Sequence, residues 1–429
     1  QSSWVRDILP LVNRITRTLA ILPLLLLTAC DKRATGPLPQ EAYVWQRDWN
    51  PAVQEAVRQA SDFARIVVLT AEVDLRGDLP RIFRTPLAPA TLKASGRPVG
   101  AAVRVSSFPT RFADDPKRAD AVRRVVRDVL AEARAKGIQL TEIQIDYDCP
   151  DSKLEDYRTF LSSLRAETGK TPLVITALPT WIGRRKDFNN LIDAADGYVL
   201  QVHSVTQPKG RGTELVLCDP ETARWWVEQV ARFGKPFRVA LPTYSYSLMF
   251  NAEGKLLGVS AESSLFTLPE GARVRRVNSD PEDMAGLIQY WTRDRPEQLA
   301  GILWYRLPVE GDRMNWSKAT LQAVMAGRTP KGEVRAAPRE PEPGLVEIEI
   351  VNAGEAEAPA PATVQVRWKG EAPIAADGLS VYRVVKAPGE IRLERSGPGV
   401  LRPGERRTIA WLRFADRTEV SLELPKEAG

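Results

Sequence analysis

The chain has 429 residues, of which 43% are hydrophobic and 27% charged, a composition typical of a globular protein. Its length exceeds that of one average domain and suits a barrel followed by a smaller domain. The net charge of +6 is small for this length, and the basic residues are scattered without a stripe, which argues against nucleic-acid binding.

Residues 1–29 have the features of a secretory signal peptide. Arg14 and Arg17 precede an apolar run, residues 19–27, and small residues follow it. The run is too short to span a bilayer comfortably. We therefore expect an exported protein.

The four residues that end at Cys30, "LTAC", resemble the lipobox of bacterial lipoproteins. This resemblance implies cleavage before Cys30 and a lipid on its thiol, with residues 30–41 as a tether to the membrane. A plain signal peptide or a membrane anchor is the alternative. We expect the protein in the bacterial cell envelope, facing the periplasm, on either the inner or the outer membrane.

From residue 42 onward, short apolar segments alternate with amphipathic ones. Eight apolar segments predict strands, at residues 43–45, 66–71, 99–105, 143–147, 173–178, 198–202, 238–241 and 302–305. Residues 119–136 have helical spacing, and Asp219 and Asp280 are each followed by proline, a common helix start. Eight strand–helix units in residues 42–328 predict an α/β fold, a (β/α)8 TIM barrel. A doubly wound open sheet is the alternative, but it lacks an obvious glycine-rich phosphate loop here.

The last hundred residues have a different pattern. Residues 329–344 are rich in proline and charge, which predicts an extended, exposed linker. In residues 345–429, short alternating segments are separated by Gly and Pro, which predicts an all-β, immunoglobulin-like sandwich. Such a domain could bind a glycan or a partner, or only pack against the barrel.

The fourth predicted strand ends in "IQIDYDCP", residues 143–150. Side chains alternate along a strand, so Gln144, Asp146 and Asp148 share one face and the apolar residues share the other. We expect the polar face to point to the barrel axis, at the carboxyl end where TIM barrels hold their chemistry. Two nearby carboxylates repel, so one retains a proton and could act as a general acid.

Other predicted strand ends also carry polar or aromatic residues, namely Glu72, Arg104, Trp181, Gln201, His203, Tyr244, Trp304 and Arg306. Aromatic rings stack on the apolar face of a sugar, and acids and amides bond its hydroxyls, so this set suits a glycan site. A structural ion network of Arg104, Asp146 and Arg306 is the alternative. His203, the one histidine, could equally be a buried, hydrogen-bonded residue.

Other kinds of chemistry find little support. One histidine and no paired-cysteine spacing argue against a metal site. A Ser-His-Asp triad would need a G-x-S-x-G elbow, and no such elbow or P-loop is present. We expect no cofactor.

The strand ends resemble those of the chitinase-like family 18 glycoside hydrolases, whose fourth strand ends in an I-D-I-D-W-E-Y-P type motif. In that resemblance Asp148 stands at the acid and Asp146 at the aspartate that supports it. Ala240–Tyr244 is similar to the family's G-L-P-x-Y, and Gly301–Trp304 to the strand whose tryptophan floors the sugar pocket.

Three positions depart from that family. Asp148 is one methylene shorter than the usual Glu, Gln144 replaces the first aspartate, and residues 201–203 differ from the usual Met-x-Tyr-Asp ending. The chain more closely resembles a bacterial barrel family known as domain of unknown function 3142, in "IQIDYD" and in "WYRLP" (Trp304–Pro308). That resemblance implies a fold and supplies no activity.

We therefore predict an envelope-anchored lipoprotein whose barrel acts on a poly- or oligosaccharide. Asp148 would be the general acid and Asp146 would orient it, with Glu72 as a candidate base or nucleophile. The substrate-binding residues would be Trp304, Tyr244, Trp181, Gln201, His203, Arg306 and Arg104. A catalytically silent glycan-binding or envelope-assembly lipoprotein is the alternative, and a scaffold with a plugged barrel mouth is the third. The expected partners are a glycan and, through Cys30, the membrane; no protein partner can be named.

The two remaining cysteines predict a disulfide in an oxidising compartment. Cys149 follows the fourth strand and Cys218 lies in the loop after the sixth, so both belong to the same rim. The bond would close a loop of about 70 residues and stabilise by roughly 4 kcal/mol. Two unpaired buried thiols are the alternative.

Overall fold

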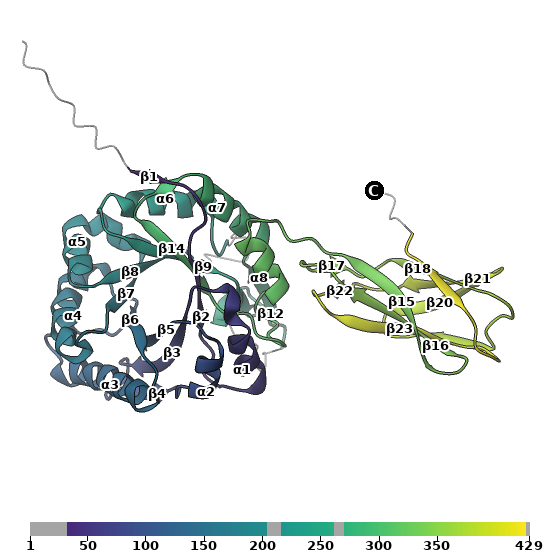
Figure 1. Cartoon of the computed structure of the whole chain (residues 1–429), viewed down its shortest axis with the longest axis horizontal. Coiled ribbons are helices and arrows are strands. Elements are labelled where there is room, and N and C mark those ends of the chain that lie inside the picture. The colour runs from purple at the N-terminus through teal and green to yellow at the C-terminus, as the bar shows by residue number, and fades with distance from the viewer. Residues whose placement is uncertain (1–31, 204–215, 261–269, 426–429) are drawn as a thin grey trace, which may run out of the picture. The chain divides into compact units, whose positions relative to one another are not determined.

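The computed structural model describes residues 32–203, 216–260 and 270–425. The predicted signal peptide and Cys30 lie outside the described residues. Within them, a barrel is followed in sequence by a β domain (Figure 1). None of the helices in these ranges is long and apolar enough to cross a membrane.

Eight parallel strands form the barrel, and each coincides with a predicted strand. Their order in the sheet is β2-β14-β9-β8-β7-β6-β5-β3, and pairing between β2 and β3 closes the ring. The strands are β2 Gln40–Val44, β3 Arg65–Asp74, β5 Val99–Val105, β6 Leu140–Tyr147, β7 Leu173–Ala177, β8 Gly197–Gln201, β9 Phe237–Pro242 and β14 Leu299–Tyr305. The predicted TIM barrel is thus confirmed.

Helices surround this ring (Figure 1). They are α1 Pro51–Arg58, α2 Pro89–Ala94, α3 Pro116–Ala135, α4 Leu154–Thr168, α5 Arg185–Asp193, α6 Pro220–Ala231, α7 Pro281–Arg293 and α8 Lys318–Met325. Several begin at a proline that follows a capping side chain. At Asp219 and Asp280, for example, the carboxylate accepts a hydrogen bond from a backbone N–H in the first turn of the following helix.

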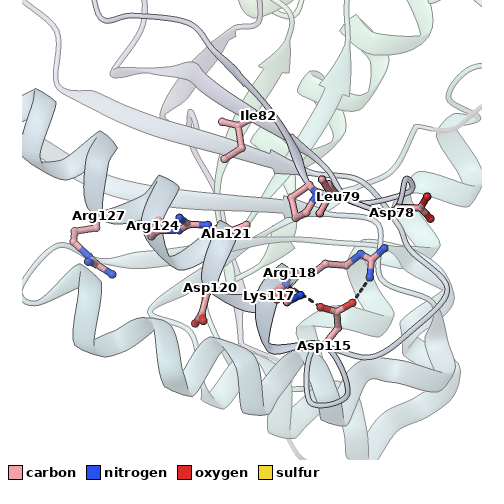
Figure 2. A pocket seen from close by; sticks show the side chains of 11 residues that line it. Asp78, Leu79, Ile82, Asp115, Lys117, Arg118, Asp120, Ala121, Arg124 and Arg127 are labelled. Carbon is pink, nitrogen blue, oxygen red and sulfur yellow. Dashed lines mark hydrogen bonds and ion pairs between the residues drawn. The ribbon is translucent and has the colours of Figure 1, made fainter.

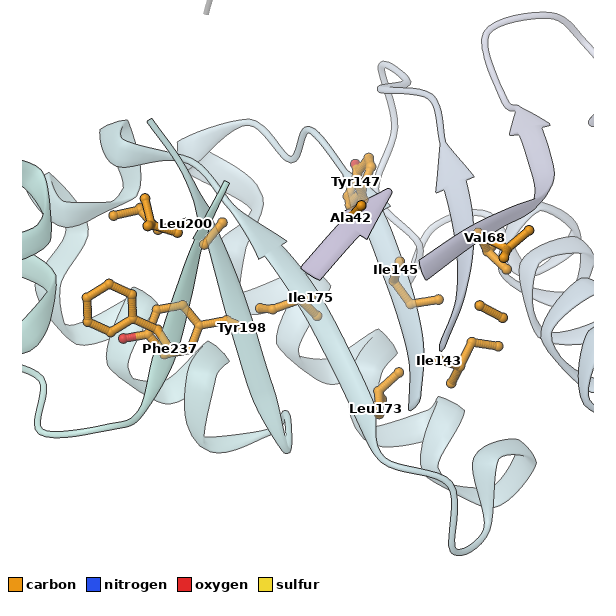
Figure 3. Close-up of a cluster of buried hydrophobic side chains, with 14 of the residues drawn as sticks. Ala42, Val68, Ile143, Ile145, Tyr147, Leu173, Ile175, Tyr198, Leu200 and Phe237 are labelled. Carbon is orange, nitrogen blue, oxygen red and sulfur yellow. The ribbon is translucent and has the colours of Figure 1, made fainter. Parts of the chain in front are cut away.

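The outer face of the barrel packs against the helices. Figure 3 shows Ile143, Ile145 and Tyr147 of β6 with Leu173 and Ile175 of β7 in this apolar layer. All five side chains are almost completely buried. The polar face of β6 therefore points to the barrel interior, as its alternation predicts.

Additional strands extend the carboxyl ends of the barrel strands. Strand β4, Arg81–Arg84, forms an antiparallel hairpin with β3. Between β9 and β14, a three-stranded antiparallel sheet is formed by β10 Ser245–Phe250, β11 Leu256–Ser260 and β12 Arg273–Asn278. At the opposite end of the barrel, β1 Arg33–Ala34 pairs with β13 Arg295–Pro296.

The C-terminal region is all-β, as predicted. One four-stranded sheet contains β15 Val334–Glu342, β16 Leu345–Asn352, β23 Arg406–Arg413 and β19 Ala375–Gly378. A second contains β20 Tyr382–Ala387, β21 Glu390–Arg395, β18 Thr363–Trp368 and β24 Val420–Glu423, and a small pair joins β17 Ala358–Pro359 to β22 Val400–Leu401. Side chains of both larger sheets meet in one core, which includes Ile348, Val366, Leu393 and Leu412.

The predicted linker is wrong for most of its length. Residues 334–342 form β15, an edge strand that pairs along β16. Pro338 and Pro341 are compatible with this position because an edge strand leaves one row of backbone groups unpaired.

The predicted disulfide is also wrong, since Cys149 and Cys218 are both free and buried. Each thiol lies against a different part of the helical layer. Cys149 is near Asp156 of α4, whereas Cys218 is near Asp283 of α7. Helices α5 and α6 separate these two helices around the ring (Figure 1).

Candidate functional site

The barrel interior begins, at the amino ends of the strands, with a cluster of four charged residues. We call Glu41, Arg65, Glu142 and Arg238 the lower ion cluster. Arg238 donates to Glu41 and to both carboxylate oxygens of Glu142, the latter at 3.0 Å, and Arg65 donates to Glu142. Two acids and two bases thus neutralise one another in a buried layer.

Gly100 makes room for this cluster. A Cβ atom at Gly100 would lie 2.9 Å from Cγ of Glu142 and 3.3 Å from the side chain of Val67. Real side chains do not approach so closely, so glycine at this point of β5 lets the Glu142 side chain fill the axis.

Above the lower ion cluster, polar and aromatic side chains fill the middle of the barrel. The amide of Gln144 donates to Glu142 at 2.5 Å and accepts from the Tyr43 hydroxyl at 2.6 Å. Val67, Leu69 and Leu303 surround this chain of hydrogen bonds. We call the mouth the part of the barrel interior that lies beyond Gln144, at the carboxyl ends of the strands.

Asp146 is held in place at the base of the mouth. Its Oδ1 accepts hydrogen bonds from the Thr176 hydroxyl at 2.9 Å and from the Gln201 amide at 3.1 Å. Its side chain is only 15% exposed. Burial, followed by the neighbouring Asp148 carboxylate, raises the pKa of Asp146 to about 6.

Asp148 occupies the rim, two residues further along. It is exposed and makes no hydrogen bond with a described residue. Partial removal of water around the carboxylate raises the pKa of Asp148, and the charge of Arg104 partly offsets this rise. The charges of Asp146 and Asp148 repel each other, so this pair of carboxylates retains a proton closer to neutral pH than an ordinary aspartate does.

Arg104 stands between the acids of the mouth without bonding to any of them. Its guanidinium lies 3.9 Å from Asp146 and 4.0 Å from Glu72, beyond hydrogen-bond distance. Its side chain is 44% exposed. Glu72 is instead paired with Arg47, so this candidate base is already engaged by a cation.

Aromatic rings form the wall of the mouth opposite the acids. The Tyr305 ring stacks on His203 at 5.6 Å and meets Tyr244 edge-on at 5.3 Å. The Tyr244 hydroxyl donates to Tyr246 at 2.9 Å and lies 3.3 Å from Nδ1 of His203. Tyr246, on β10, is close enough to Arg104 and Asp148 for electrostatic interaction.

His203 is neutral in this setting. Burial lowers its pKa to about 4. Its Nε2 atom is buried and has no hydrogen-bond partner among the described residues. His203 could therefore donate or accept a hydrogen bond, but it is poorly suited to hold positive charge at neutral pH.

The prediction that Trp181 and Trp304 line the site is wrong. Both side chains are completely buried in the layer between barrel and helices. The Trp304 indole donates to Gln40, and the Trp181 indole donates to the Cys149 carbonyl. Tyr305, one position after Trp304, is the β14 residue that points into the mouth.

Arg306 is likewise turned to the protein. It is buried and donates to Asp312 at 2.6 Å. Its backbone N–H and C=O are both bonded to the Thr243 side chain. A substrate-contacting role for Arg306 is therefore not supported, and its role is to hold the chain that follows β14.

The structure thus brings together most of the predicted site, and it adds Tyr305, Tyr246 and Thr176. On β14, Tyr305 lies on the face opposite to Ile302 and Trp304, but the apolar run does not indicate which face points to the interior. Nothing in the sequence marks Thr176 as a site residue, because its role depends on its hydrogen bond to Asp146, which only the structure shows.

A cavity of about 900 Å³ lies elsewhere, between the β3–β4 hairpin and α3. Figure 2 shows Leu79 and Ile82 of the hairpin facing Arg118 and Arg124 of the helix. Its lining includes none of the mouth residues. Among the described residues, no group of three or more His, Cys, Asp or Glu side chains is placed to hold a metal ion.

Several solved structures resemble the chain at low identity. The spore cortex-lytic enzymes SleL of Bacillus megaterium QM B1551 and Bacillus cereus are both 11% identical, with TM-scores of 0.46 and 0.48. They cover 65% and 68% of this chain and 72% and 75% of their own. A chitinase from Bacteroides thetaiotaomicron is 14% identical, with a TM-score of 0.42, covering 63% of this chain and 90% of its own. Similarity at this level is a likeness of chain trace and does not define a function.

Family models match both parts of the chain, whereas no curated protein matches it. The C-terminal residues 335–415 match a Domain of unknown function (DUF8456). Residues 95–310, half of the chain, match a Domain of unknown function (DUF3142), which is the family whose motifs the barrel strands resemble. The chain belongs to the DUF3142 family.

Proposed function

We propose that the protein is an envelope lipoprotein whose barrel mouth cleaves a poly- or oligosaccharide by carboxylate acid catalysis. The observation that carries this proposal is the pair of neighbouring acids at the end of β6, both with raised pKa values. One member, Asp146, is fixed by Thr176 and Gln201. The other, Asp148, is exposed and free to meet a ligand, as a general acid must be.

The wall of the mouth supports a glycan as the ligand. Tyr305 and Tyr246 offer rings and hydroxyls, and Gln201 and His203 offer polar atoms beside them. Sugars bind to such mixed surfaces because one side of the ring is apolar and its rim carries hydroxyls. Asp148 would protonate the leaving oxygen, and Asp146 would hold the shared proton until that step.

A glycan-binding protein without activity is the second candidate. The Glu72 carboxylate is paired with Arg47, and no other acid in the described part of the mouth is a free base or nucleophile. Cleavage by two carboxylates requires such a partner for the acid. This pairing favours binding over catalysis.

Replacing Asp148 with Asn distinguishes the two candidates. The chain from Asp31 would be tested for binding and hydrolysis of bacterial envelope and exopolysaccharide glycans. If the protein is an enzyme, Asp148→Asn should lower the hydrolysis rate by about 10²- to 10⁴-fold, because general acid catalysis contributes about that much. Binding should change little.

Asp151→Asn is the matched control, because Asp151 lies three residues further on and is bonded to Thr180. Its hydrolysis rate should stay within about twofold of the unmodified chain, since it makes no contact with the mouth. Binding without cleavage, unchanged in both variants, would contradict the enzyme and support the binding protein.

A further inference from the structure

The amino ends of the barrel strands and the carboxyl ends of the helices form one end of the barrel, which we call the basal face. Five exposed cations occupy its loops and helix ends. They are Lys93, Arg134, Lys170, Arg232 and Arg293. None of the five forms an ion pair with another described residue.

Most carboxylates of the basal face are already neutralised. The pairs are Glu167 with Arg127, Asp193 with Lys235, Asp196 with Arg165 and Asp294 with Arg33. The five unpaired cations are therefore in excess at this end. A surface of this kind is complementary to a negatively charged one.

The N-terminal segment is fastened to the same face. Strand β1 pairs with β13. Arg33 donates hydrogen bonds to Asp294, the residue before β13, at 2.7 Å and to Glu228 of α6 at 2.8 Å. The backbone N–H of Gly36 donates to the Thr292 carbonyl, and the Gly36 carbonyl accepts from the Arg295 side chain. Figure 1 shows β1 beside α6 and α7.

Because the N-terminal segment is attached to the basal face, a lipid on Cys30 would lie near that face. Cys30 precedes Arg33 by three residues, a length of chain that spans at most about 11 Å. A lipid on Cys30, as in the proposed function, would keep the basal face close to the bilayer. The mouth is at the opposite ends of the strands.

We propose that the basal face binds the anionic phospholipid head groups of the membrane, so that the mouth opens away from it. The excess of cations supplies the attraction, and the fastened N-terminal segment supplies the orientation. Only the orientation rests on the proposed lipid anchor. Such cations also stabilise helix carboxyl ends through the helix dipole; that role affects folding stability and requires no lipid.

Vesicle binding of the chain from Asp31, which contains all of the described residues, tests the proposal without the lipid on Cys30. Residues 33–429 form one structural unit, distinct from residues 1–32. Co-sedimentation would use vesicles of phosphatidylglycerol with phosphatidylcholine and vesicles of phosphatidylcholine alone. We expect binding to the anionic vesicles that weakens as salt rises.

Two variants with the same loss of charge locate the contact. The basal variant carries Lys93→Gln, Arg134→Gln, Lys170→Gln, Arg232→Gln and Arg293→Gln. The control variant removes five exposed cations from the mouth end of the barrel, by Lys117→Gln, Arg184→Gln, Lys186→Gln, Arg273→Gln and Arg313→Gln. The basal variant should bind the anionic vesicles at least about tenfold more weakly, and the control variant should bind within about threefold of the unmodified chain.

Equal weakening in both variants, or equal binding to neutral and anionic vesicles, would overturn the proposal. Thermal unfolding of each variant shows whether a loss of binding reflects a loss of fold. Hydrolysis of the glycan by the basal variant should be unchanged, so the failure of either proposal is recognised separately. In the lipidated full chain, a fluorophore at Gln139→Cys should report contact with lipid, whereas one at Glu310→Cys should not.

Discussion

The barrel contains two charged layers, one at each end of its interior, that are built from the same residue types in different ways. In the lower ion cluster, Glu142 receives hydrogen bonds from Arg65, Arg238 and Gln144. In the mouth, Arg104 approaches Asp146 and Glu72 only to about 4 Å, and both aspartates have raised pKa values.

This difference indicates that the lower ion cluster stabilises the fold, whereas the mouth is the candidate site. A buried charge that has all its partners needs nothing further, whereas one that lacks them destabilises the folded chain unless something binds it. The lower ion cluster leaves Nε of Arg65 without a hydrogen bond, whereas the mouth leaves both Nε2 of His203 and the Asp148 carboxylate without a partner among the described residues. A barrel with only the lower ion cluster would be explained as a scaffold. The polar groups of the mouth that lack partners are the reason to expect a ligand.

Glu142→Gln tests the lower ion cluster and should have the largest effect on folding. Arg65 and Arg238 would lose the carboxylate that holds them both, and the side chain that carries it is only 3% exposed. Breaking a buried ion pair from one side costs about 3–5 kcal/mol. Urea unfolding would measure the loss of unfolding free energy.

Glu167→Gln is the control for this variant. Glu167 pairs with Arg127, whose side chain is 58% exposed, so the change should cost less than about 1 kcal/mol. Similar losses in the two variants would show that the lower ion cluster is no more satisfied than a surface pair, and the comparison would fail.

The sequence predicted the two layers unequally. On β6, apolar and acidic residues alternate, so the facing of Asp146 and Asp148 could be derived from the pattern alone. On β14, four consecutive apolar or aromatic residues, Ile302–Tyr305, carry no such alternation, because a barrel strand is buried on both faces. The resemblance to the family 18 glycoside hydrolases predicts Trp304 in the site, and nothing in the residue pattern of β14 points to Tyr305 instead.

Other errors came from information that a sequence lacks. The prolines of residues 334–342 are compatible with a linker and with an edge strand, and only the partner strand β16 decides between them. Cys149 and Cys218 both follow barrel strands, but the separation of their helical surroundings is known only once the ring is closed.

The pH dependence of stability tests the raised pKa of Asp146. Its pKa of about 6 in the folded chain exceeds the ordinary value of 3.8, so the folded chain holds the proton more tightly. Its stabilising contribution is complete below pH 3.8 and is lost as the pH rises through about 6. The loss is at most about 3 kcal/mol.

The difference in unfolding free energy between the unmodified chain and Asp146→Asn reports this effect together with the change at the neighbouring Asp148, since carboxylates away from the mouth contribute equally to both. The variant should gain stability relative to the unmodified chain between pH 4 and pH 7. A constant difference across that range would mean that Asp146 titrates normally, and the mouth would then be as satisfied as the lower ion cluster.

The smallest expected effect distinguishes the two neighbouring aromatic residues of β14. Tyr305→Leu removes a ring that stacks on His203 in the mouth, and it should weaken glycan binding by about three- to tenfold, the contribution of one aromatic contact. Trp304→Phe removes the indole that bonds to Gln40 in the outer layer, so it should lower unfolding free energy and leave glycan affinity unchanged. Isothermal titration with the bound glycan, beside urea unfolding, measures both. The opposite result, with affinity lost at Trp304 and retained at Tyr305, would place the ligand outside the mouth and would remove the reason for treating the upper charged layer as a site.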